Sequence, residues 1–136
     1  MSNFSEAASR HWTDGKLLFE AERYDNADQL FGFTAECAIK AALNSIAGQR
    51  REAELGDRYW CHIETLWDRA PIQQLSKNYP GLVTLLRQQN PFSNWAASQR
   101  YDAAGTISRE VSDDHRKVAQ RLLRATQLIG TRAGAT

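Results

Sequence analysis

Apolar residues recur at helical spacing along most of the chain, and the clearest run covers residues 11–46. In its second half, apolar positions follow one another at intervals of four, four, three, four and four residues. This spacing keeps the side chains on one face of an α-helix. Because most of them are alanine, a neighbouring helix can approach closely. The stripe consists of Ala27, Phe31, Ala35, Ala38, Ala42 and Ile46.

A short polar break at residues 23–26 divides this run into two predicted helices that face each other. The first is expected to begin near Ser5, a residue that suits an N-cap, and the second at Asp25 or Asn26. Gly48 is expected to end the second helix. The apolar residues of the first helix are Trp12, Leu17, Leu18, Phe19 and Ala21.

Three more helical segments are predicted. One covers residues 58–70, and a short one opens at Pro80, whose missing amide proton suits the first helical position. The last runs from Ser108 or Ser112 to residue 129, and residues 95–105 are expected to be mostly irregular, with aromatic side chains against the bundle. The apolar stripe of the last helix comprises Val111, His115, Val118, Leu122, Ala125 and Ile129.

No stretch of useful length alternates apolar and polar residues as a β-strand does. The pattern therefore predicts an all-α fold, an up-and-down helical bundle of four to five helices. Residues 1–130 are expected to form one domain. Residues 131–136 are small and polar, and we expect them to form a disordered C-terminal tail.

The composition agrees with one globular domain: 136 residues, 42% of them hydrophobic, with a formal net charge of +1. This charge creates no overall field that would attract nucleic acid or a membrane. Cys37 and Cys61 lack the CxxC spacing of zinc and redox motifs, and no Gly-rich phosphate loop occurs. Without a secretory h-region or a membrane span in the sequence, we expect a cytoplasmic protein that needs no metal or cofactor.

Four short motifs occur in a particular order. They are ERYDNA at residues 22–27, TAECAIKAAL at 34–43, HIETL at 62–66 and QRYD at 99–102. In this order and spacing they resemble the motifs of the HEPN domain family, and the likeness spans about residues 12–129. The resemblance implies a bundle of four or five helices that is often paired into dimers.

HEPN proteins differ in chemistry. Many are metal-independent ribonucleases with an arginine and a histidine separated by four to six residues, whereas others lack this pair and act as binding partners, antitoxins or immunity proteins. Arg109 and His115 have five residues between them and are the candidate catalytic pair. A histidine can take the proton of a 2′-hydroxyl, and an arginine can hold the phosphate and its developing charge.

Three features count against catalysis by this pair. Glu110 follows Arg109, where the nucleases of the family favour an uncharged polar residue. Asp113 and Asp114 would bring negative charge to the phosphate. His115 also falls on the apolar stripe of the last helix, where a histidine is more often a partly buried structural residue. The sequence thus favours a structural His115 and keeps the ribonuclease as an alternative.

Two other histidines are assigned structural roles. His62 and Arg58 make a second pair, one residue short of the family spacing, and His62 is expected to pack at a helix start and bond a polar group. His11 and Asp14 share a helical face but lack the two further ligands that a metal site needs.

Basic residues on the last helix define a candidate surface for RNA or a nucleotide. Phosphate contacts need basic side chains on one face, and an ordinary solvated helix face is the alternative explanation. The candidates are Lys117, Arg121 and Arg124.

The sequence contains four tryptophans, and two of them belong to a candidate protein interface. Trp12 and Trp67 fit the core, whereas the others lie near helix starts or turns. Aromatic residues and arginine are favoured at interface hot spots, although closing the ends of the bundle is the simpler role. The interface candidates are Trp60, Trp95, Arg100 and Tyr101.

Together these features favour a non-catalytic HEPN-like binding protein. Its partner would be a protein, such as a toxin nuclease or other second component, or a second copy of the chain, and the protein would serve as an antitoxin or immunity protein of a toxin system. The alternatives are a metal-independent ribonuclease that uses Arg109 and His115, and a nucleotide-binding module.

Overall fold

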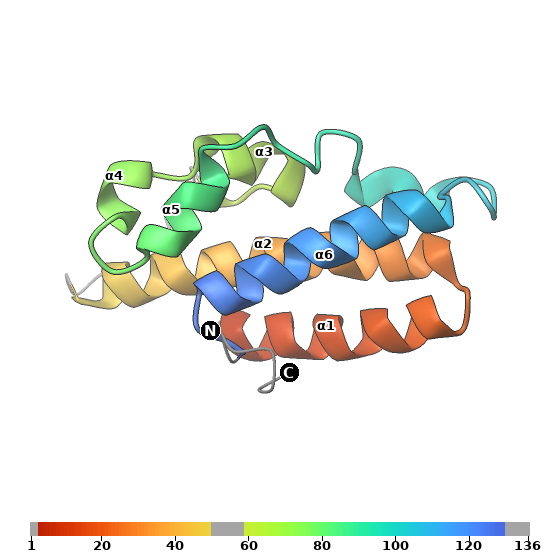
Figure 1. Ribbon diagram of the computed structural model, residues 1–136, viewed down its shortest axis with the longest axis horizontal. Helices are drawn as coiled ribbons and strands as arrows, with labels where there is room; N and C mark the ends of the chain where they lie inside the picture. Colours follow the sequence, from red (N-terminus) through yellow and green to blue (C-terminus); the bar gives the residue numbers. More distant parts are fainter. Residues whose placement is uncertain (1–2, 50–58, 130–136) are drawn as a thin grey trace.

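The computed structural model describes residues 3–49 and 59–129. Its regular secondary structure in these ranges is helical (Figure 1). No β-strand occurs in these two ranges, so the predicted all-α bundle is confirmed. The expected disordered tail at 131–136 and the polar segment 50–58, including Arg58, lie outside the described residues. The elements are α1 (Phe4–Glu20), α2 (Tyr24–Gln49), α3 (Ile63–Arg69), α4 (Ile72–Leu75), α5 (Pro80–Leu86), the 3₁₀ helix η2 (Ala97–Tyr101) and α6 (Arg109–Ala125).

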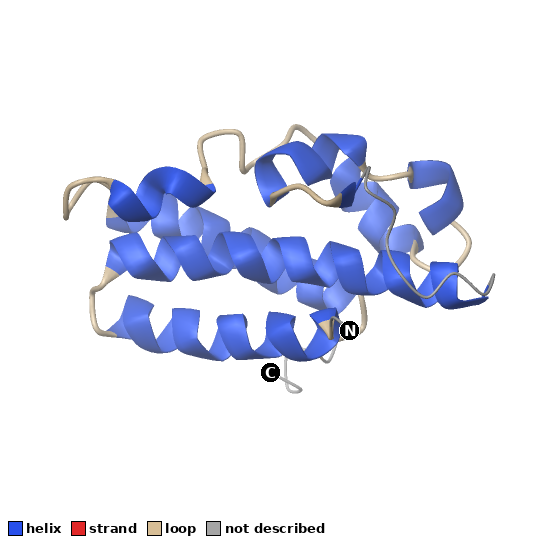
Figure 2. Ribbon diagram, turned by 180° about the vertical axis from the view of Figure 1, so that it is seen from behind, coloured by secondary structure: helices blue, strands red, loops and turns tan. Residues whose placement is uncertain are grey.

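The long helix α2 forms the axis of the bundle and contacts α1, α3, α4, α6 and η2. Its predicted apolar stripe is confirmed, because every member from Ala27 to Ile46 is at most 8% exposed. Figure 2 shows α1 lying alongside α2 after a short turn. Gly15 makes this contact close: a Cβ at that position would lie 2.8 Å from the ring of Phe31.

The last helix, α6, runs parallel to α2 (Figure 1). Near the start of both helices His115 bonds Asp28, and near their ends Ser45 bonds Tyr79 while Ala125 faces Gly81 of α5. The segment that contains α3, α4, α5 and η2 therefore carries the chain back along the bundle before α6 begins.

Several predicted boundaries differ from the structure. Asn3, not Ser5, caps α1, because its side chain accepts the amide of Glu6 at 3.0 Å. The third helix begins at Ile63 instead of residue 58, and α2 begins at Tyr24 and ends at Gln49. The expected start of the last helix is confirmed, since Ser108 accepts the Val111 amide at 3.1 Å. Residues 97–101, expected to be irregular, form η2.

The buried face of α6 is rotated from the predicted stripe. Ser112 and Ala119 are fully buried, whereas Val111 and Val118 remain partly exposed. Small side chains allow α6 to approach α2 closely, and larger valines at the contact would hold the helices apart. In α1, Leu17 also departs from expectation, since it is 62% exposed.

Candidate functional site

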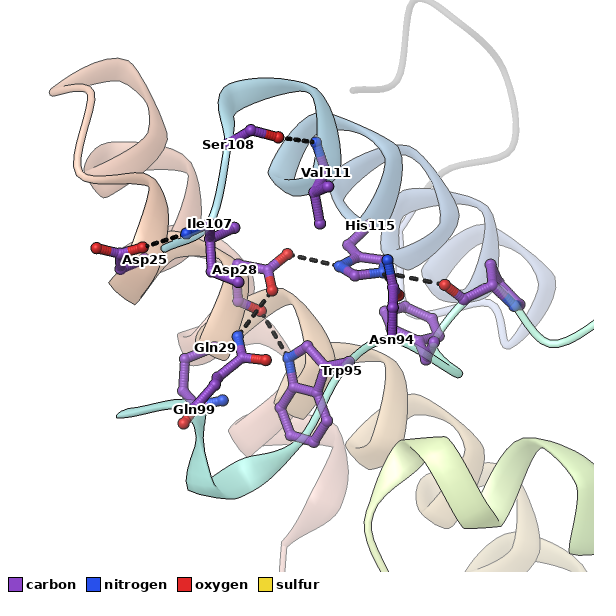
Figure 3. A network of polar contacts seen from close by, with 12 residues as sticks. Asp25, Asp28, Gln29, Asn94, Trp95, Gln99, Ile107, Ser108, Val111 and His115 are labelled. Carbon is purple, nitrogen blue, oxygen red and sulfur yellow. Dashed lines mark hydrogen bonds and ion pairs between the residues drawn. The ribbon is translucent and has the colours of Figure 1, made fainter. Parts of the chain in front are cut away.

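A buried histidine–carboxylate pair joins α6 to α2 (Figure 3). His115 Nδ1 lies 2.6 Å from Oδ1 of Asp28, and both residues are at most 1% exposed. The other ring nitrogen, Nε2, lies 3.0 Å from the carbonyl oxygen of Pro91 and 2.9 Å from Oδ1 of Asn94. The imidazole also stacks on Phe92, with ring centroids 4.8 Å apart. Every polar atom of the ring is thus used inside the fold.

Three oxygen atoms surround the imidazole ring. One belongs to the Asp28 carboxylate, one to the Pro91 carbonyl and one to the Asn94 side-chain amide. The ring is therefore held from both sides by polar groups of the fold, and its hydrogen bond to Asp28 is shielded from water.

Asp28 is further fixed by residues of the segment before α6. Its second carboxylate oxygen accepts a hydrogen bond from Gln99 Nε2 at 2.8 Å, and its backbone carbonyl accepts one from Trp95 Nε1 at 3.0 Å. The indole lies directly over Gly32, where a Cβ would come within 2.0 Å of the ring. The network therefore ties α2, η2 and α6 together at one end of the bundle.

Arg109 does not join His115. Its side chain is exposed, donates to the Tyr24 hydroxyl at 3.2 Å and lies over the rings of Phe19 and Tyr24. His115 instead faces Asp28 and the loop before η2. The R-x5-H pair thus does not converge on one open cleft in which both side chains could contact a phosphate.

The structure does gather other candidates around a shallow pocket along α6. His115, Lys117 and Arg121 line it with Pro91, Asn94 and Asp114, and partly exposed Val111 and Val118 line it as well. Lys117 is bound to Asp113 at 3.1 Å. Arg124 does not line this pocket and is partly buried, with its Nε buried and without a hydrogen bond.

The predicted aromatic interface is not one surface. Trp95 is 2% exposed, and its assignment to an interface is wrong, because its indole packs over Gly32 and bonds Asp28. Trp60 is 51% and Tyr101 77% exposed. Trp60 contacts Phe4 at the start of α1, whereas Arg100 lies over Tyr101 in η2, at the opposite end of the bundle (Figure 1).

A second polar cluster lies under Trp60. The carboxylate of Glu36 accepts from Lys40 Nζ at 2.9 Å, and its other oxygen lies 2.9 Å from His62 Nδ1. Glu36 and Lys40 are at most 7% exposed, and the Lys40 ammonium lies 5.0 Å from the Trp60 ring centroid. The expectation that His62 bonds a polar group at a helix start is therefore confirmed. Burial raises the pKa of the neighbouring Cys37 thiol to about 12, which keeps it protonated and unreactive.

The sequence does not reveal the hydrogen-bond partners of His115 and His62. Asp28 is separated by three, seven and ten residues from Phe31, Ala35 and Ala38, so it lies on the buried face of α2. A charged residue in such a stripe signals a buried partner. Nothing in the sequence indicates that this partner is 87 residues away.

Within the described ranges, no three His, Cys, Asp or Glu side chains are grouped to hold a metal ion. None of the described helices has the length and apolarity to cross a membrane. A scan of protein-family models, a search of curated proteins and a search of solved structures each found no match.

Proposed function

We propose that this protein is a non-catalytic HEPN-like bundle that docks a protein partner. The partner is a toxin or other second component, or a second copy of the chain, and the role is that of an antitoxin or immunity protein. The observation that carries the proposal is that the ring of His115 is hydrogen-bonded within the fold. Both of its ring nitrogens bond groups inside the fold, which leaves no free base for RNA cleavage.

Exposed side chains support the docking part of the proposal. Leu17, Trp60 and Tyr101 are large, apolar or aromatic, and more than half exposed. Trp60 and Tyr101 are held in place by contacts with Lys40 and Arg100, so little conformational entropy is lost when a partner covers them. Tryptophan, tyrosine and arginine are the residue types that dominate binding energy at protein interfaces.

Capture from the native host tests this function. The tagged full chain is cross-linked in cells and purified, and the proteins bound to it are identified by quantitative mass spectrometry. The oligomeric state of the purified protein is measured separately by sedimentation. We expect either one stoichiometric protein partner or a dimer. The proposal is rejected if neither is found. It is also rejected if the protein cleaves RNA and the His115→Ala variant, with its fold checked by circular dichroism, does not.

RNA or nucleotide binding is a second candidate, favoured by the pocket along α6. Arg121 is exposed there and has no ion pair in the described part of the chain. Fluorescence anisotropy with a short single-stranded RNA tests it, with Arg121→Gln compared to Arg87→Gln, an exposed arginine that directly follows α5. Salt-sensitive binding that only Arg121→Gln weakens would support this function. Equal binding by both variants would end it.

A further inference from the structure

His62 has one ring nitrogen bonded to a buried carboxylate and the other free at the surface. Its Nδ1 lies 2.9 Å from Oε1 of Glu36, and no group within residues 3–49 and 59–129 bonds its Nε2. The His62 side chain is 51% exposed, whereas that of Glu36 is only 10% exposed. Because the two nitrogens of an imidazole point away from each other, the bond to Glu36 directs Nε2 toward solvent. His115, in contrast, uses both nitrogens inside the fold.

The surroundings of the His62 ring fix its orientation and its tautomer. The rings of Phe33 and Trp95 border it in edge-to-face arrangements, with centroids 5.9 and 6.3 Å away. A carboxylate can only accept a hydrogen bond, so Glu36 receives the Nδ1 proton, and in the neutral ring the lone pair lies on Nε2. His62 is therefore an oriented nucleophile at the surface of the bundle.

Lys40 sets the charge beside this nucleophile. Its ammonium lies 2.9 Å from the second oxygen of Glu36, so the carboxylate does not present an uncompensated negative charge to an incoming anion. When Nε2 forms a bond to an electrophile, the ring becomes positive while Nδ1 keeps its proton. Glu36 then accepts a charge-assisted hydrogen bond from that nitrogen and stabilises the product. This arrangement suits an electrophile that is itself anionic.

We propose that Nε2 of His62 accepts a phosphoryl group from an acyl phosphate, either a free one or a phosphorylated aspartate of another protein. The nitrogen lone pair attacks phosphorus and an N–P bond forms. The bond between phosphorus and the acyl oxygen breaks, and the carboxylate leaves with the electron pair. The Nδ1 proton stays on the ring, so no further reactant is needed. The inference goes beyond the proposed function and does not depend on it.

Acetyl phosphate is the probe for the acceptor site. The full chain is incubated with it at neutral pH and analysed by intact mass and peptide mapping without acid, because phosphohistidine is acid-labile. We expect one phosphoryl group, on His62, which His62→Ala loses. His11→Ala is the matched control, since its imidazole borders the same Phe33 ring, and it is expected to retain the modification.

A double variant tests the role of the carboxylate. Glu36→Gln with Lys40→Met removes the orienting carboxylate without leaving a buried ammonium unpaired, and circular dichroism checks that it folds. We expect phosphorylation of His62 to become at least about tenfold slower, because the hydrogen bond that fixes the ring and compensates its charge is lost. A rate equal to that of the wild type would overturn the inference.

A lysate of the native host distinguishes the two sources of the acyl phosphate. Its small molecules are removed by gel filtration, and ATP and the tagged full chain are then added. Transfer to His62 that hydroxylamine prevents indicates a phosphorylated aspartate of a protein, because hydroxylamine cleaves acyl phosphates. Transfer from acetyl phosphate alone indicates a free donor. The inference is rejected if neither arm modifies His62, or if His11 reacts as fast as His62. Neither result bears on the capture of a protein partner, so the proposed function is tested separately.

Discussion

At the scale of single residues, Asp28 and His115 hold two helices together through a hydrogen bond that water does not reach. Each residue is at most 1% exposed, and Asp28 bonds both His115 and Gln99. Removing one partner leaves the other buried without its hydrogen bond, which costs more than the pair contributes over apolar residues of the same size. The pair therefore fixes how α6 lies on α2 more than it adds to stability.

Replacing the buried carboxylate tests this account. Asp28→Asn keeps the shape but removes the charge that faces His115, and an amide nitrogen replaces one of two accepting oxygens. We expect a loss of about 3 kcal/mol in the free energy of unfolding, measured by urea denaturation. Asp114→Asn, exposed on α6, serves as the matched control and should change stability by less than about 0.5 kcal/mol. Equal stability of the two variants would contradict a structural role for the bond between Asp28 and His115.

The buried ion pair of Glu36 and Lys40 provides a second test of how much stability depends on a buried group keeping its partner. Glu36→Gln leaves the Lys40 ammonium buried without its counter-charge, and we expect it to lower stability by about 3 kcal/mol. The double variant Glu36→Gln with Lys40→Met removes both charges and is expected to recover most of this loss. Thermal unfolding of the two variants and the single Lys40→Met completes the cycle. Additive losses would show that the two side chains are not coupled.

At the scale of helices, the sequence predicts the features that follow from helical periodicity. It does not predict those that depend on which element packs against a helix. The stripe of α2 is correct because its members from Ala27 to Ile46 are buried on a helix that contacts α1, α3, α4, α6 and η2. The stripe of α6 is correct at His115 and Leu122, but the buried face is turned toward the neighbouring positions Ser112 and Ala119. Val111 and Val118 remain partly exposed, because periodicity alone does not specify which side of the helix faces α2.

The candidate site can likewise be predicted from the sequence only in part. The structural role of His115 follows from its place on an apolar stripe, but Asp28 and Asn94 become its neighbours, and Gln99 a neighbour of Asp28, only through the fold. Arg109 shows the limit of a motif: five intervening residues satisfy the family spacing, yet the side chain packs on Phe19 instead. Spacing along a helix fixes the direction of a side chain and not the group that it meets.

Gly32 gives a prediction at the same scale, since it sets how closely the segment before η2 lies on α2. Adding a Cβ there would meet the Trp95 ring at 2.0 Å, so Gly32→Ala must displace the indole and break its bond to Asp28. We expect a loss of about 3 kcal/mol and a change in tryptophan fluorescence. Gly81→Ala in α5 has an ordinary contact at 4.0 Å and should keep or raise stability. A Gly32→Ala variant as stable as Gly81→Ala would refute this packing.

At the scale of the whole molecule, α2 touches elements that come both early and late in the described chain. It packs on α1 before it in sequence and on α3, α4, η2 and α6 after it, and its centre consists of residues such as Ala35, Ala38 and Ile39 that are fully buried. The polar networks at Asp28 and Glu36 also begin on this helix. Global unfolding is thus required to expose its middle, whereas η2, which has no buried residue, can open separately.

Native-state hydrogen exchange tests this hierarchy. We expect the slowest amides in the middle of α2, around Ala38 and Ile39, and an exchange free energy there equal to the global free energy of unfolding. Amides of η2, whose residues are not fully buried, should exchange through local opening at much lower free energy. Asp28→Asn should lower protection in α6 and η2 together, because Asp28 bonds both His115 and Gln99. If α6 and η2 respond separately, the buried carboxylate does not couple them, and the bundle is held by apolar contacts alone.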